Sequence, residues 1–100
     1  MKKFLFTGRA KKDLADIRRF SQEQWGNQKA EAYLSKICEK IRLAALHPSI
    51  GIDSSESLKL GLEIRSILCA SHIIYYTVLE THISVVAILH QHMAPKLHLF

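Results

Sequence analysis

Apolar residues recur at helical spacing through the first half of the chain. They form two sets on successive segments: Ala10, Leu14, Ile17 and Phe20, and then Ala30, Tyr33, Leu34, Ile37, Ile41 and Ala44. Steps of three and four place each set on one side of a helix, with charged residues elsewhere. The pattern therefore predicts two consecutive amphipathic helices.

Turn-forming and capping residues set the expected limits of these helices. Thr7 is a candidate N-cap, because its hydroxyl can accept a hydrogen bond from an amide of the first turn. Gly26 suits the left-handed position that ends a helix, and Asn27 is the expected cap of the next one. Pro48 should stop the second helix. The short link predicts that the helices fold back on each other as an αα-hairpin.

The second half has a different pattern, with dense runs of Ile, Val, Leu, Tyr and Thr. The runs "LEIRSILCA" (62–70), "HIIYYTVLE" (72–80) and "HISVVAILH" (82–90) have the length and composition of strands. Short links between them predict an antiparallel meander, and "KKFLF" (2–6) predicts a further strand before the helices. Residues 47–60, rich in turn formers, are expected to be a loop.

These elements predict a single α+β domain over residues 1–100, in the order β-α-α-β-β-β. The helical hairpin should cover one face of the sheet and leave the other face as an open concave surface. With 48% apolar and 23% charged residues, the composition is that of an ordinary globular domain. No apolar run is long enough for a membrane helix, and no signal peptide is evident, so we expect a cytoplasmic protein that does not bind membranes.

Positive charge is concentrated in the first half of the chain. Residues 1–50 hold eleven Lys and Arg against five acids, whereas residues 51–100 hold three against four. A basic half attracts polyanions, and nucleic acid, the ribosome and an acidic protein all stay open as partners on charge alone.

Several kinds of chemistry find no support in the sequence. The four glycines are isolated, which excludes a phosphate-binding loop, and Cys38 and Cys69 are expected to be buried, reduced thiols. His90 and His92 would share one face of a strand, but a metal site needs a third donor that no spacing supplies. We therefore expect no metal and no cofactor.

A metal-free ribonuclease is the enzymatic alternative. It needs an acid, a base and cations around the phosphate, and the chain contains residues of these kinds. The candidates are Arg65, His72, Tyr76, His90 and His92. Arg65 interrupts an apolar strand, where a guanidinium needs a partner, and the structural alternative is an ion pair with Glu63. Tyr75 and Tyr76 should face opposite sides of the sheet, as successive strand residues do.

Several stretches together resemble the ParE toxins of the RelE/ParE superfamily, the toxic halves of type II toxin–antitoxin pairs in bacteria. They are "TGRAKKDLADIRRFSQEQWG", "QKAEAYLSKI", "LAALHPSIG", "LEIRSILCASHIIYYTV" and "ISVVAILHQHM", which occur in family order over nearly the whole chain. The resemblance implies the fold predicted above. It also implies an activity: ParE-like toxins poison DNA gyrase, whereas RelE-like relatives cleave messenger RNA on the ribosome.

Comparison with the pattern of RelE-like nucleases favours gyrase, and not messenger RNA, as the target of this chain. Those nucleases use several cations, one of them an arginine on the last strand, where this chain has Ala87, and only Lys59 stands nearby. Many ParE-like sequences also carry an arginine at that position and an aspartate where this chain has Ala94. We expect a non-enzymatic gyrase toxin. The alternatives are a RelE-like endoribonuclease that would use Arg65, His90 and His92, and a degenerate, harmless member of the family.

The resemblance also implies two binding surfaces. The expected contacts with the target are Arg65, His90, His92, Met93, Lys96 and Leu97, mostly at the end of the last strand and beyond it. A small acidic antitoxin, disordered until bound, should form a hetero-oligomer with the toxin and contact Arg9, Lys12, Arg18, Arg19 and Lys36.

Overall fold

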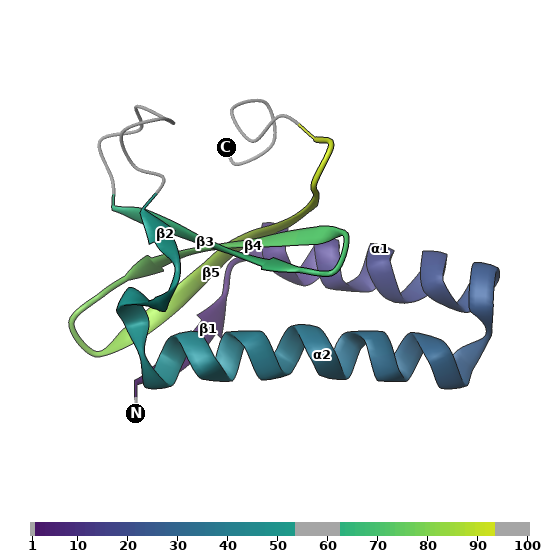
Figure 1. Cartoon of the computed structure of the whole chain (residues 1–100), viewed down its shortest axis with the longest axis horizontal. Coiled ribbons are helices and arrows are strands. Elements are labelled where there is room, and N and C mark those ends of the chain that lie inside the picture. The colour runs from purple at the N-terminus through teal and green to yellow at the C-terminus, as the bar shows by residue number, and fades with distance from the viewer. Residues whose placement is uncertain (1, 54–62, 94–100) are drawn as a thin grey trace.

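The computed structural model describes residues 2–53 and 63–93. Its elements in chain order are β1 (Lys3–Phe6), α1 (Gly8–Trp25), α2 (Asn27–Leu46), the 3₁₀ helix η1 (Pro48–Ile50), β2 (Ile52–Asp53), β3 (Ile64–Cys69), β4 (His72–Val78) and β5 (His82–His90). The strands form one sheet in the order β1-β5-β4-β3-β2 (Figure 1). The predicted α+β class and the order of its main elements are confirmed.

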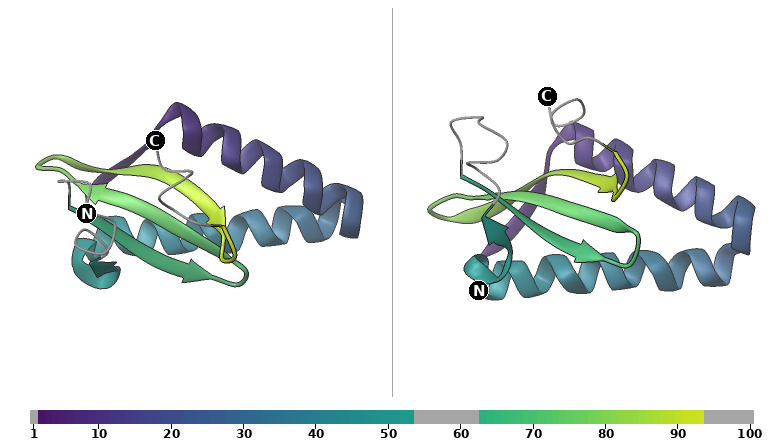
Figure 2. Two further views of the ribbon diagram at one scale, coloured as in Figure 1. Left: turned by 90° about the horizontal axis from the view of Figure 1, so that it is seen from above. Right: turned by 45° about the horizontal axis from the view of Figure 1, so that its top comes forward.

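The topology explains why the helices lie on one side of the sheet. Strands β3, β4 and β5 are an antiparallel meander, whereas β1 pairs with β5 in parallel, through Lys3 to Phe6. A parallel partner requires a crossover, and here it includes the α1–α2 hairpin, which runs back along the sheet (Figure 2). One end of the hairpin extends past the strands.

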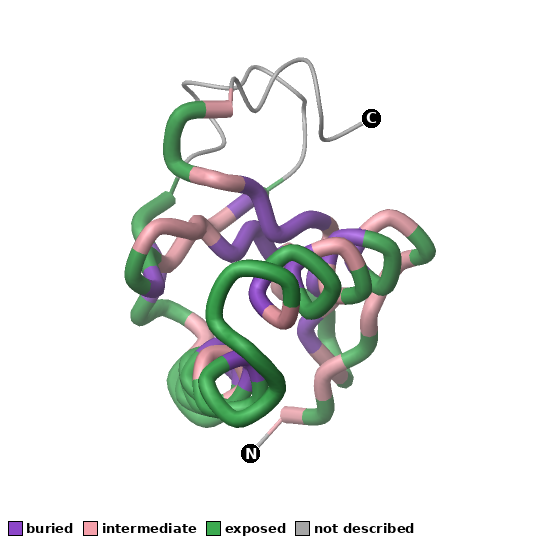
Figure 3. Tube along the Cα trace, turned by 90° about the vertical axis from the view of Figure 1, so that its right-hand side faces the viewer, coloured by how far each residue is buried: buried purple, intermediate pink, exposed green. Residues whose placement is uncertain are grey.

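The main core lies between the helices and the sheet (Figure 3). Ile37 and Ile41 of α2 are buried there against the helix-facing side of the strands, which includes Ile74, Tyr76 and Ile83. Burial of such side chains is the main source of stability in a domain of this size. Neither helix is long and apolar enough to cross a membrane.

The opposite face of the sheet is not the open surface that the sequence predicted. Ile64, Tyr75, Ala87 and Leu89 form a second cluster there, and all four are buried. Tyr75 and Tyr76 thus do face opposite sides, as expected. Both faces of the central strands carry core residues, which explains their nearly continuous apolar sequences.

The helix ends confirm two of the three expected caps. The Thr7 hydroxyl accepts a hydrogen bond from the Ala10 amide at 3.1 Å, and Gly26 ends α1 with φ of 85°. The prediction for Asn27 was wrong: Asn27 is the first residue of α2, and Gly26 precedes it with no side-chain cap. One glycine serves both helix ends, because its positive φ turns the chain abruptly.

The buried stripe of α1 also differs from the predicted one. Asp13 and Ser21 are buried together with Ala10 and Ile17, whereas Phe20 is 56% exposed. Phe20 lies far along α1, towards the turn at the end of the hairpin. Its edge-to-face contact with Trp25, 6.4 Å between ring centroids, occurs on the surface.

Part of the expected loop is ordered and contains η1 and β2, while residues 54–60 lie outside the described part of the chain. Tyr76 holds this segment: its hydroxyl donates to the Pro48 carbonyl at 2.8 Å and accepts from the Gly51 amide at 3.0 Å. A Cβ at Gly51 would stand 2.5 Å from that hydroxyl oxygen, so glycine is required by close packing.

Candidate functional site

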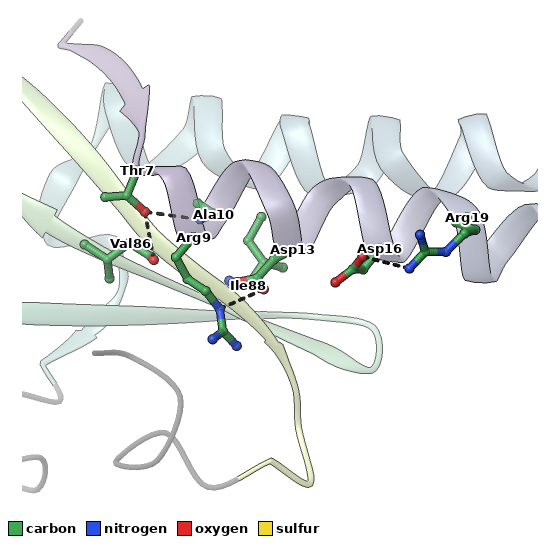
Figure 4. A network of polar contacts seen from close by, with 8 residues as sticks. All are labelled: Thr7, Arg9, Ala10, Asp13, Asp16, Arg19, Val86 and Ile88. Carbon is green, nitrogen blue, oxygen red and sulfur yellow. Dashed lines mark hydrogen bonds and ion pairs between the residues drawn. The ribbon is translucent and has the colours of Figure 1, made fainter.

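The C-terminal half of β5 has hydrogen-bond partners from the start of α1 on the side where β1 no longer pairs with it. Strand β1 pairs with β5 only as far as Val85, and a bulge at Val86 breaks the register with β4. Beyond that point α1 and its N-cap Thr7 supply the partners (Figure 4). The Thr7 hydroxyl donates to the Val86 carbonyl, and Asp13 accepts from the Ile88 amide, both at 3.0 Å.

Asp13 holds this part of the candidate site in place and was not among the residues predicted from the sequence. It is 8% exposed, and its other carboxylate oxygen accepts a hydrogen bond from Arg9 Nε at 2.9 Å. Both oxygens therefore have partners, which a buried carboxylate requires. The only sequence signal was the i,i+4 pair of Arg9 and Asp13, which is also common on solvated helix surfaces.

Aromatic and imidazole rings form a continuous series at the end of β5. Successive ring centroids are 6.1 Å apart from Trp25 to Tyr33, 5.6 Å to His72, 5.5 Å to His90 and 5.0 Å to His92. His90 and His92 were expected on one face of a strand. His90 is instead the last strand residue and His92 lies in the turn, where its ring still contacts that of His90.

Hydrogen bonds fix this end of the sheet. Tyr33 and His72 approach to 2.6 Å between the hydroxyl and Nδ1. The His92 amide donates to His90 Nδ1 at 3.2 Å, and the Met93 amide donates to the His90 carbonyl at 2.9 Å. Burial lowers the pKa of His72, the neighbouring His90 lowers it further, and Asp13 partly opposes them. The imidazole of His72 is therefore held towards its neutral form.

A groove of about 500 Å³ lies between α1 and the end of β5. Exposed Phe20 and Trp25 line it on the helical side, and His90 and Met93 line it on the sheet side. Arg9 also lines this groove. One member of the predicted antitoxin set thus shares a surface with two members of the predicted target set.

Arg65 is engaged within the chain and lies away from His90. Its side chain, 21% exposed, donates to the Gly51 carbonyl at 2.8 Å and forms the predicted ion pair with Glu63 at 3.3 Å. Arg65 pairs with Tyr76 and His90 with His72, four positions apart along β4, which corresponds to about 13 Å. The structure brings His90, His92 and Met93 together and leaves Arg65 apart from them.

The predicted antitoxin contacts differ in their surroundings. Arg9 pairs with Asp13, Arg19 with Asp16, and Arg18 with Glu31 across the hairpin. Exposed Lys12 and Lys36 have no ion pair with any residue of 2–53 or 63–93. Lys96 and Leu97 of the predicted target set, like Lys59 and Ala94, lie outside the described residues.

The chain is a small α+β protein in which a helical hairpin covers one face of a mostly antiparallel sheet and a groove lies beside the last strand. The fold matches a protein described as the chromosomal ParDE toxin–antitoxin system from P. aeruginosa, with a TM-score of 0.74 over 90% of this chain and 96% of that one, at 18% identity. Residues 4–95 match the family of ParE toxins of type II toxin–antitoxin systems. The chain belongs to this family.

Two relatives agree with that assignment. The chain is 33% identical to Toxin ParE1 of Caulobacter vibrioides over 99 residues, 99% of both chains. It is also 33% identical to Toxin ParE1 of Mycobacterium tuberculosis (strain CDC 1551 / Oshkosh) over 92 residues, 91% of each.

Proposed function

We propose that this ParE-family protein is a non-enzymatic toxin that poisons DNA gyrase in the bacterial cytoplasm, and that a cognate antitoxin neutralises it. Membership of the ParE family is the observation that carries the proposal, because poisoning of gyrase is the activity that the resemblance implies. A poison that stabilises another enzyme's complex with DNA needs a contact surface and no catalytic group of its own.

The geometry argues against the RelE-like alternative. A ribonuclease must place acid, base and cation around one phosphate, within hydrogen-bond reach of the reacting atoms. Arg65 and His90 are separated by about four strand positions, or about 13 Å, and Arg65 is bonded to Gly51 and Glu63. No lysine or arginine stands on β5, where Ala87 is buried.

Neutralisation is proposed to occur by competition for the groove beside β5. Arg9, from the antitoxin set, and His90 and Met93, from the target set, line the same groove. A partner that fills it excludes the other. Arg65 remains a predicted target contact. A target that binds its guanidinium would compete with the bonds to Gly51 and Glu63.

The test is a supercoiling and cleavage assay with purified toxin, gyrase and plasmid DNA, beside a ribosome-dependent messenger RNA cleavage assay. We expect gyrase-dependent linear DNA that disappears on addition of the antitoxin. Met93→Asp, which places a charge in the groove, should abolish the linear product, and Leu79→Asp, an exposed position beside the β4–β5 turn, should not. Intact DNA with cleaved messenger RNA would overturn the proposal.

A further inference from the structure

Three imidazole rings from different parts of the chain meet at the end of the sheet. His72 begins β4, His90 ends β5 and His92 lies in the turn that follows. The centroid distances of 5.5 Å and 5.0 Å mean that protonation of two neighbouring rings places like charges in direct contact.

The hydrogen bond from the His92 amide requires an unprotonated acceptor. His90 Nδ1 accepts it at 3.2 Å, so the proton of the neutral His90 ring is on Nε2. Protonation of His90 places a second N–H at Nδ1, which faces the amide N–H and can no longer accept it. The turn then keeps the bonds of the Gln91 amide to the Ser71 carbonyl and of the Met93 amide to the His90 carbonyl, both 2.9 Å.

Among the described residues, the charges around the ring series are largely committed elsewhere. From α1, Asp13 is bonded to Arg9 and to the Ile88 amide, and Asp16 is paired with Arg19. From α2, the hydroxyl of Tyr33 faces His72, and Lys29 and Lys36 line the surface beside that tyrosine. No carboxylate among these groups pairs directly with an imidazole, and the Asp13 charge, which favours protonation of His72, is shared with Arg9, so repulsion between charged rings is only partly offset.

We propose that His72, His90 and His92 form a proton-sensitive latch, which holds the His92 amide of the turn at residues 91–93 when neutral and releases that amide at mildly acidic pH, weakening gyrase binding. The second part rests on the proposed function, because His90, His92 and Met93 are the expected target contacts. Histidine is the side chain whose ordinary pKa permits such a response near neutrality.

The latch is tested by hydrogen exchange of the His92 amide in the purified chain, with protection factors corrected for the intrinsic effect of pH. Between about pH 7.5 and about pH 5.5, protection should fall by about five- to tenfold, the usual value of one hydrogen bond. His90→Asn keeps an acceptor near the position of Nδ1 without titrating, so its protection should not change. His82→Asn, at the other end of β5, should respond like the wild type.

Unchanged wild-type protection, or an equal fall in His90→Asn, would overturn the latch. Gyrase affinity is then measured at both pH values as the ratio of wild type to His90→Asn, which cancels the response of gyrase itself. We expect this ratio to fall on acidification, and a constant ratio would overturn the regulatory claim. Absence of gyrase binding at either pH would refute the proposed function, while hydrogen exchange would still decide the latch.

Discussion

The Asp13 carboxylate accepts a hydrogen bond from the Ile88 amide of β5 beyond Val85, where the pairing of β5 with β1 ends. It receives the Ile88 amide and the Arg9 guanidinium, and thereby joins α1 to the strand that carries His90. A helix side chain thus takes the place of a strand partner beside the groove, which Asp13 and Ile88 both line. The same residue therefore contributes both to stability and to the shape of the candidate site.

Replacing Asp13 with alanine should lower the free energy of unfolding by about 1–3 kcal/mol, because the buried Ile88 amide loses its acceptor. Urea denaturation measures the loss. Asp16→Ala is the matched control on the same helix: its carboxylate pairs with Arg19 at the surface, with 47% of its side chain exposed, and should contribute under about 1 kcal/mol. Equal losses in both variants would show that the bond to β5 adds nothing.

The hydroxyl of Tyr76 stabilises the segment before β2 through its two hydrogen bonds. Tyr76→Phe leaves the Gly51 amide and the Pro48 carbonyl without their partner, and should cost about 1–3 kcal/mol in thermal or urea unfolding. The control is Tyr75→Phe, on the opposite face, whose hydroxyl forms no hydrogen bond with the described residues, and this change should be nearly neutral. A neutral result for Tyr76→Phe would contradict a stabilising role for its two bonds.

The proposed antitoxin contacts on the helical hairpin are of two kinds: arginines that already form ion pairs and lysines that form none with the described residues. Arg18 already links α1 to α2 through Glu31, whereas Lys12 and Lys36 have no ion pair with the described residues. An acidic partner gains most from cations that do not have to leave an existing pair. The lysines should therefore dominate electrostatic attraction of the antitoxin.

Lys12→Glu and Lys36→Glu should slow association with the antitoxin and reduce its dependence on salt, with a smaller effect for Arg19→Glu. Stopped-flow association at several salt concentrations measures both quantities. Lys3→Glu, at an exposed position on β1 away from the hairpin tip, is the control for net charge. Association rates equal to that of the Lys3→Glu control would eliminate the two lysines as contacts.

The pattern of apolar residues predicted every long element, because each helix buries one stripe and the central strands bury residues on both faces. It could not predict the two-residue strand β2, which has no periodicity of its own and is positioned by Tyr76 and Arg65. Nor could it reveal the bulge at Val86, which puts both Val85 and Ile88 on the helix-facing side. Both features depend on contacts between segments far apart in sequence.

For the whole molecule, His72 links stability to pH. Burial lowers its pKa in the folded chain below the ordinary value of 6.5, so the unfolded chain binds this proton more readily. The contribution of His72 is therefore present above about pH 6.5 and is lost as pH falls below it, towards the folded-state pKa.

Urea unfolding between about pH 7.5 and about pH 5.5 should show a decline in the free energy of unfolding that is smaller in His72→Gln, which does not titrate. His47→Gln, exposed beside η1, is the control and should follow the wild type. An identical pH dependence in His72→Gln and the wild type would exclude a contribution from His72.

The α+β class, the helical hairpin, the antiparallel meander and the resemblance to ParE toxins could all be predicted from the sequence, because they depend on periodicity and on the order of local motifs. It also placed the Thr7 cap, the Gly26 turn and the Arg65–Glu63 pair, which are short-range effects. Only the folded chain shows that Arg65 lies apart from His90 and that Asp13 accepts a hydrogen bond from the Ile88 amide of β5. Those relations depend on strand register and on crossover of the chain, which join residues with no fixed spacing in the sequence.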